Sequence, residues 1–213
     1  MRTEVLIDQL TNSVVAIPRH AAAKRLCAGL GLGALAALAL LIASLGVRPD
    51  IAEVSGTAPF WMKWAFTLSL GWSSFIIVKR LARPGGRVGF AWWGLAAPIG
   101  VVALMGFGET MQAPAALREG MWLGRTAVQC PIAILLLSVP VFLGLVWAFR
   151  RLAPTRLRLG GMAAGLLAGS AGASIYVLTC PEHTVAFMAT WYTAGVLAAG
   201  LAGALAGRRL LRW

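Results

Sequence analysis

Long apolar stretches separated by short, charged segments are the main pattern of this chain. Six of these stretches approach the roughly 20 residues that an apolar helix needs to cross a bilayer. The segments between them hold most of the charges and prolines. The pattern predicts an all-α, polytopic membrane protein with six transmembrane helices. They are expected over Leu26–Val47, Phe60–Val78, Val88–Phe107, Ile132–Phe149, Gly160–Leu178 and Thr184–Ala206.

Composition excludes the other broad classes of protein. Of the 213 residues, 59% are hydrophobic and only 12% are charged, and the mean hydropathy is +0.79. A soluble domain has about 25% charged residues and could not bury this much apolar surface, which excludes a soluble enzyme. The few charges exclude disorder, and a cysteine count of only three excludes a disulfide scaffold. The chain is therefore expected to divide into an N-terminal segment (1–25), a membrane domain (26–206) and a short basic tail (207–213).

The basic residues predict how the chain is oriented. Most of the 19 lysines and arginines lie in the N-terminal segment, the second and fourth connections and the C-terminal tail. The other side of the membrane has only Arg48, Arg118 and Arg125, with Lys63 near the start of a span. Basic loops stay in the cytoplasm, so both termini are expected there. The lipid bilayer explains the net charge of +12, and no direct contact with nucleic acid is needed.

The predicted spans carry no acidic, basic or histidine side chain near their centres. Ion pathways, proton relays and many substrate sites in membranes depend on such groups. The two histidines, His20 and His183, are expected on opposite sides of the membrane, so no catalytic set can be assembled and no cofactor is expected. A small transporter or channel for a neutral or metal solute, built on backbone groups, remains an alternative.

Residues 3–17 predict a short amphipathic helix in the cytoplasm, capped by Thr3 and ended before Pro18. One face would carry the apolar side chains Leu6, Leu10, Val14 and Ile17, and the opposite face the acidic side chains Glu4 and Asp8. The helix could lie on the membrane surface, but surface helices favour lysine and arginine on the polar face. It could instead dock its apolar stripe into a groove of a cytoplasmic protein. The residues leave these two interpretations about equal.

Cysteines in Cys-Pro pairs lie at the outer edges of the fourth and fifth spans, at Cys130 and Cys180, whereas Cys27 is an ordinary apolar position. In an oxidising periplasm the two outer thiols could form a disulfide. They could also bind a soft metal, with His183 as a third ligand. A static disulfide or two inert thiols is as compatible with these residues as a sensing role.

Small residues recur every four positions in the fifth and sixth spans. The positions are Gly161, Gly165 and Gly169 in the fifth span and Gly195, Ala199, Gly203 and Gly207 in the sixth. Such faces allow the backbones of two helices to approach closely. The contact is expected either between these two spans or across the interface of a homo-oligomer.

The combination resembles the NrsF family of polytopic anti-sigma factors, negative regulators of ECF sigma factors in proteobacteria. The resemblance spans the chain and rests on the N-terminal stretch T-E-V-L-I-D-Q-L, the six spans, and the cysteines in the contexts Q-C-P and T-C-P-E-H. It implies a protein of the bacterial inner membrane that keeps a sigma factor away from RNA polymerase. It also implies that Cys130 and Cys180 sense heavy-metal or oxidative stress. Unlike other anti-sigma factors, this chain has no zinc-binding His–Cys–Cys domain.

The leading hypothesis is therefore a membrane anti-sigma factor whose N-terminal helix binds an ECF sigma factor. The transporter or channel is the alternative and predicts a continuous polar path through the bundle. A thiol oxidoreductase that uses the external cysteines is a weaker third hypothesis, since the chain has no recognisable site for a quinone or thiol partner.

Overall fold

A computed structural model of the chain describes Thr3 and residues 21–82, 85–86, 88–150, 152 and 156–211. The helix predicted over residues 3–17 falls almost wholly outside these ranges. Its proposed binding residues, Glu4, Leu6, Asp8, Leu10, Val14 and Ile17, therefore have no structural description.

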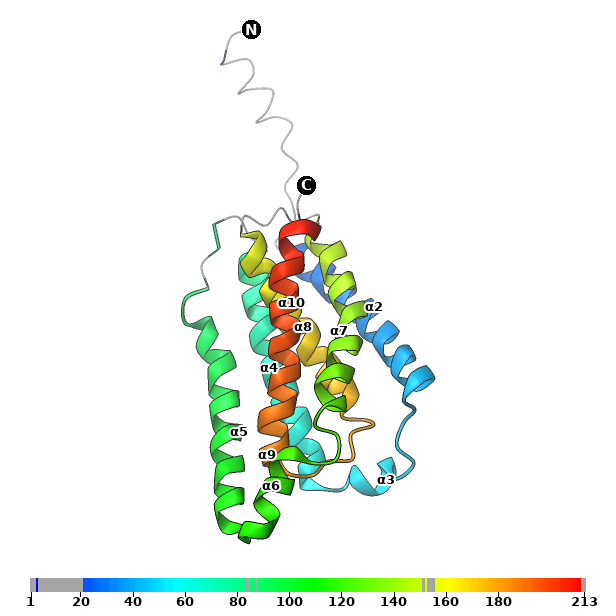
Figure 1. Cartoon of the computed structure of the whole chain (residues 1–213). Coiled ribbons are helices and arrows are strands. Elements are labelled where there is room, and N and C mark those ends of the chain that lie inside the picture. The colour runs from blue at the N-terminus through cyan, green and yellow to red at the C-terminus, as the bar shows by residue number, and fades with distance from the viewer. Residues whose placement is uncertain are drawn as a thin grey trace.

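All regular structure in the described ranges is helical, which confirms the all-α class. Long helices form an up-and-down bundle (Figure 1). They are α2 (Ala21–Ser44), α4 (Ala58–Leu81), α5 (Trp93–Gln112), α7 (Gln129–Phe149), α8 (Leu157–Tyr176) and α10 (Thr193–Leu210). The connections contain the short helices α3 (Ile51–Val54), α6 (Ala115–Leu123) and α9 (Val185–Phe187), the 3-10 turn Gly89–Trp92 and the π-helical turn Met188–Tyr192.

Five helical segments of the described chain are long and apolar enough to cross a membrane. They are Ala21–Ser44, Gly89–Gln112, Gln129–Phe149, Leu157–Tyr176 and Val185–Leu210. The remaining predicted span corresponds to α4, a helix of 24 residues that carries Lys63 and several hydroxyl side chains and is not among these five segments. Five of the six predicted spans thus have a matching apolar helix, and the membrane crossing of α4 stays a prediction.

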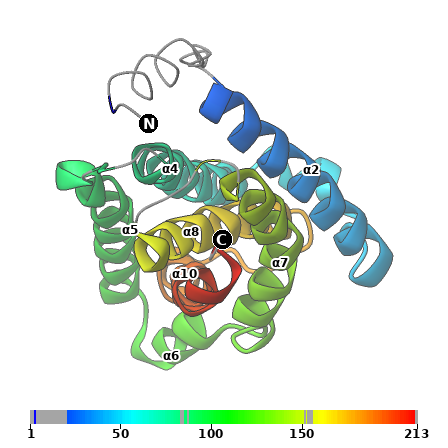
Figure 2. The same ribbon diagram turned by 90° about the horizontal axis from the view of Figure 1, so that it is seen from above.

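The centre of the bundle is α8, which packs against α4, α7 and α10, while α5 lies beside α4 and α2 lies outside α7 (Figure 2). Its small residues let the neighbouring backbones come into contact. A Cβ on Gly165 would lie 3.0 Å from Gly200 Cα and would collide with the carbonyl oxygen of Ala199 on α10. Because lipid provides no hydrophobic drive between helices, such close packing is a main source of attraction between them. The predicted small-residue faces therefore meet each other within one chain, except at Gly195, where a Cβ would meet the side chain of Ile134 on α7.

A second close contact joins α2 to α7. Gly29 and Gly144 face each other so closely that a Cβ on either would collide with the carbonyl oxygen of the other. One turn further along α2, a Cβ on Gly33 would lie 2.8 Å from the carbonyl oxygen of Pro140. Since α2 lies on the outside of the bundle, α7 is the main helix that holds it in place (Figure 2).

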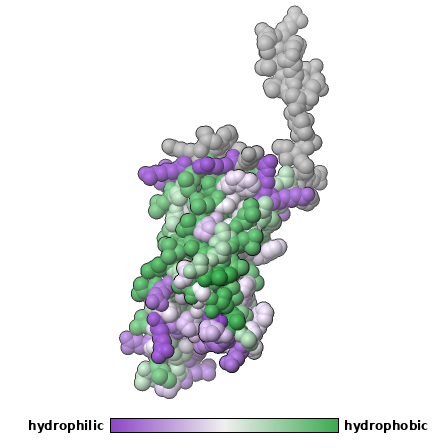
Figure 3. Space-filling view, turned by 90° about the vertical axis from the view of Figure 1, so that its right-hand side faces the viewer, coloured by the Kyte–Doolittle hydropathy of each residue, from purple (hydrophilic) through white to green (hydrophobic). Residues whose placement is uncertain are grey.

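Hydrophilic residues gather at the two ends of the bundle, and an apolar band lies between them (Figure 3). We call the end where α2 begins and α10 ends the arginine end. Its described basic residues are Lys24, Arg25, Lys79, Arg80, Arg150, Arg156, Arg158, Arg208 and Arg209. The opposite end, which we call the cysteine end, has Cys130 and Cys180. It also has every described acidic residue, namely Asp50, Glu53, Glu109, Glu119 and Glu182.

Replacing Gly165 by leucine should destabilise the bundle, because its side chain would have to push apart the backbones of α8 and α10. Overpacking of this kind typically costs about 1–3 kcal/mol. The thermal unfolding of the detergent-solubilised variant, followed by fluorescence-detected size exclusion, should shift to a lower temperature.

Gly31→Leu is the matched control, since a Cβ on Gly31 of α2 would meet no atom within 4 Å. Its unfolding temperature should stay near that of the wild type. Equal shifts for the two variants would contradict the role assigned to the α8–α10 contact.

Candidate functional site

Both sensor candidates lie at the cysteine end, fully buried and as free thiols. Cys130 is the second residue of α7, and Cys180 follows the end of α8 after one further turn. Each side chain has a relative exposure of 0%. Cys27, in contrast, is exposed on α2. The sulfur atoms of Cys130 and Cys180 are thus protected from bulk water within a packed site.

Glu182 joins the segments that carry the two cysteines. One of its carboxylate oxygens, Oε1, accepts hydrogen bonds from the backbone N–H of Arg125 (2.7 Å) and from the N–H and hydroxyl of Thr126 (3.1 Å each). The N–H of Cys130 in turn donates to the carbonyl oxygen of Thr126, at 2.8 Å. The carboxylate of Glu182 therefore holds in place the turn at Arg125 and Thr126, which precedes α7 and Cys130. The sequence alone offered no reason to single out Glu182, because its partners Arg125 and Thr126 are 57 and 56 residues away along the chain.

Lys63 is the unexpected member of this site. It lies in the second turn of α4 with a relative exposure of only 4%. Its ammonium group is 3.6 Å from Cys180 Sγ and also donates a hydrogen bond to the carbonyl oxygen of Glu182. In the sequence it was only a lysine near the start of a span; its contact with Cys180 depends on how α4 packs beside α8.

Arg48 fastens the chain just after α2 to the Cys180 segment. Its guanidinium donates to the carbonyl oxygen of Cys180 (3.0 Å) and forms two hydrogen bonds of 2.7 Å with the carboxylate of Asp50. Its backbone N–H donates to the carbonyl oxygen of Leu178, at 3.3 Å. The chain that leaves α2 is therefore attached to the backbone of this segment at two points, Leu178 and Cys180.

The Arg48–Asp50 ion pair stays charged at neutral pH. Its hydrogen bonds lower the pKa of Asp50 and raise the pKa of Arg48 relative to their ordinary values. Because the pKa of Asp50 is lower in the folded protein, its contribution to stability is present above the ordinary aspartate pKa and is lost as the pH falls through the lowered value. The connection to Cys180 is thus maintained across the physiological pH range.

Two tyrosines complete the buried surroundings of the sulfurs. The rings of Tyr176 and Tyr192 pack with centroids 6.0 Å apart. Tyr192 is fully buried close to Cys180, and its hydroxyl has no hydrogen-bond partner among the described residues. Buried polar groups without partners are rare in native structures and often mark functional sites.

The predicted three-ligand metal site is not assembled. No three histidine, cysteine, aspartate or glutamate side chains of the described ranges lie together in a way that could hold a metal ion. His183 is exposed, whereas Cys130 and Cys180 are buried. Histidine and the two thiols therefore belong to different environments, although His183 is only three residues from Cys180.

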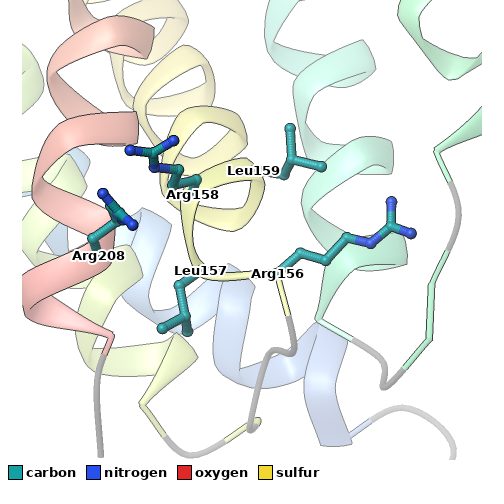
Figure 4. A pocket seen from close by; sticks show the side chains of 5 residues that line it. All are labelled: Arg156, Leu157, Arg158, Leu159 and Arg208. Atoms are coloured by element: carbon teal, nitrogen blue, oxygen red, sulfur yellow. The ribbon is translucent and has the colours of Figure 1, made fainter.

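A basic groove lies at the other end of the bundle, where α8 begins beside the end of α10 (Figure 4). It has a volume of about 370 Å³ and is lined by Arg156, Leu157, Arg158, Leu159 and Arg208. Arg158 and Arg208 lie next to each other on one side, and Arg156 points away from them. Since the described acidic residues are all at the cysteine end, this surface attracts anionic groups.

Comparisons with known proteins cover the whole chain. Residues 10–213 match a family model described as negative regulator of sigma F. The chain is 41% identical to an anti-sigma-F factor of Caulobacter vibrioides and 38% identical to a probable anti-sigma-F factor of Azospira oryzae, with all of this chain and all of each relative covered. No solved structure matches the chain.

Replacing Glu182 by alanine should loosen the cysteine end, because three donors of the turn before α7 lose their acceptor. Hydrogen bonds to a charged group contribute about 1.5–3 kcal/mol each when they are protected from water, and less when they are partly exposed, as here. The thermal unfolding temperature in detergent should therefore fall measurably. Glu119→Ala, an exposed acidic residue of α6, is the control and should leave that temperature unchanged; equal effects would contradict the bridging role of Glu182.

Proposed function

We propose that this chain, which belongs to the NrsF family of negative regulators of sigma F, holds an ECF sigma factor at the bacterial inner membrane. It releases the sigma factor when a stress signal is read at Cys130 and Cys180. The full-length similarity to two relatives named as anti-sigma-F factors carries the anti-sigma part of this proposal. The names of these relatives describe regulators and not enzymes.

The separation of charges supports an orientation with the arginine end in the cytoplasm. Basic residues near the ends of spans stay on the cytoplasmic side, whereas acidic residues have little effect on orientation. In this orientation α2 starts and α10 ends on the cytoplasmic side, and both cysteines face the periplasm. The chain before α2 is then expected on the cytoplasmic side of the membrane, the side that also carries the basic groove between α8 and α10.

Sigma capture is assigned to the N-terminal segment. Its predicted helix has an apolar face of Leu6, Leu10, Val14 and Ile17 that suits a groove on the sigma factor. The opposite face carries Glu4 and Asp8, whose charge suits the basic surfaces with which sigma factors contact DNA or polymerase. A helix of about four turns is marginally stable alone in water, so binding would also stabilise the helix itself.

The structure offers two connections between the cysteines and this segment. Arg48 links the Cys180 carbonyl oxygen to the chain at the outer end of α2. The Gly29–Gly144 contact links α2 to α7, the helix whose second residue is Cys130. A change at either cysteine would therefore act on α2, which leads directly into the N-terminal segment. To matter, this change must alter the free energy of sigma binding by about 1–3 kcal/mol, the usual range of allosteric coupling.

Transport by this bundle is less well supported. A transporter would need a polar path between the ends, whereas two of the grooves along the bundle are lined mostly by apolar side chains. The hydroxyls of Thr67, Ser170 and Ser174, which border one of them, all donate to neighbouring groups within the bundle. Backbone contact between α8 and α10 also leaves little space at the centre.

Replacing Leu10 by aspartate should abolish co-purification of the sigma factor with the detergent-solubilised protein, because the charge would enter the apolar interface. Val15→Asp is the matched control: at about 100° per residue, Val15 lies on the face opposite Leu6. We expect the control to retain the sigma factor. If deletion of residues 1–18 leaves sigma capture intact, the N-terminal segment is not the binding site.

Replacing both Cys130 and Cys180 by serine should remove the release of the sigma factor by thiol-reactive stress. A reporter gene controlled by the sigma factor would be measured with and without an oxidant or a thiol-binding metal ion. The double variant should keep basal repression and lose induction. Cys27→Ser, near the start of α2 at the arginine end, is the control and should respond like the wild type. An unchanged response of the double variant would exclude sensing at this pair.

A further inference from the structure

Lys63 is a buried cation that the proposed sensing mechanism does not yet use. Its relative exposure is 4%, and its nitrogen lies at the cysteine end between α4 and the Cys180 segment. Burying an ammonium group is costly unless an anion and hydrogen bonds compensate it. The residues around Lys63 therefore indicate what the charge is for.

No carboxylate of the described chain compensates Lys63. The ion pair found in the described ranges joins Arg48 to Asp50, so the nearby guanidinium has its own anion. Glu182 offers Lys63 only its backbone carbonyl oxygen, because its carboxylate is bonded to the turn at Thr126. The remaining hydrogen-bond partner of the ammonium, and the only one that can become an anion, is Cys180 Sγ at 3.6 Å.

The sulfur of Cys130 has no comparable partner. It is equally buried, at 0% exposure, but none of the described residues donates a hydrogen bond to it. The two thiols thus differ in electrostatic surroundings and not in burial. Thiols react as thiolates, and a neighbouring ammonium group stabilises the negative charge on sulfur.

We propose that Lys63 is a positioning residue for Cys180, which makes Cys180 the sulfur that reacts first with an electrophile and leaves Cys130 as the second sulfur. The inference rests on the proposed sensing role of the pair. It also indicates how a reaction is converted into a structural change. Once the Cys180 sulfur is bonded to another atom, it can no longer become an anion beside Lys63, which favours movement of α4 away from the Cys180 segment.

The test compares the two sulfurs in one molecule with the small, uncharged reagent methyl methanethiosulfonate. The attacking sulfur forms an S–S bond to the methylthio group, and methanesulfinate leaves. The full-length Cys27→Ser protein would be treated in detergent, and modification at each cysteine followed by mass spectrometry of peptides. Because both sulfurs have the same burial, the ratio of their rates reports their chemical difference.

Cys180 should react about tenfold faster than Cys130, because the nearby ammonium group of Lys63 stabilises the negative charge that develops on the attacking sulfur. Lys63→Met should remove this advantage, whereas Lys63→Arg, which keeps a cation, should retain much of it. Lys79→Met, at the exposed far end of the same helix, is the control and should behave like the wild type. Because Lys63→Met removes a buried charge, its unfolding temperature should not fall, and Lys63→Gln serves as a second neutral variant if it does.

Faster reaction of Cys130, or an unchanged rate ratio in the folded Lys63→Met or Lys63→Gln protein, would overturn the proposal. The proposed function has a separate test. If the ratio of the two rates depends on Lys63 but a Cys180→Ser strain still induces the reporter gene normally, Lys63 keeps its positioning role and Cys180 is excluded as the sensor. Failure of this inference and failure of the proposed function therefore give different results.

Discussion

The close backbone packing of α8 is the constraint on which the rest of the structure depends. Its glycines and alanines bring α10 into direct backbone contact, and its Gly172 meets the backbone of α7 near Leu137. In lipid, where no hydrophobic effect drives helices together, this contact area is a main source of attraction. Because α8 is fixed on several sides, the turn that follows it is fixed as well, and that turn carries Cys180.

Polar interactions at the cysteine end use this fixed turn as a common attachment point. Arg48 binds its carbonyl oxygens from the α2 side, Lys63 contacts the sulfur from α4, and Glu182 ties it to the start of α7. Segments separated by more than 100 residues thus meet around one cysteine. A chemical change at this sulfur would therefore act on α2, α4 and α7 together, as the proposed sensing role requires.

The charged residues at the two ends of the bundle interact in different ways. At the cysteine end, charges of both signs are present, and those around Cys180 are paired or hydrogen-bonded, so their energies depend strongly on their partners. At the arginine end the described charges are all basic and exposed, and their summed field attracts anionic groups. The α2 helix connects these ends through its contacts with the Cys180 segment and with α7, and it continues into the segment assigned to sigma capture.

The pattern of apolar stretches and charged segments determined the helical class, the approximate bounds of the long helices and the end of the bundle at which each charged loop lies, because a bilayer imposes a minimum length and an apolar composition on every span. It also identified the facing small residues of α8 and α10, although not which partner they would meet. Only the tertiary structure decided that Lys63, Arg48 and Glu182 converge on Cys180 and that His183 stays outside, since these contacts depend on the rotation and lateral order of the helices. A span sequence restricts which residues face inward, but the identity of the neighbouring helix is set by packing between distant parts of the chain.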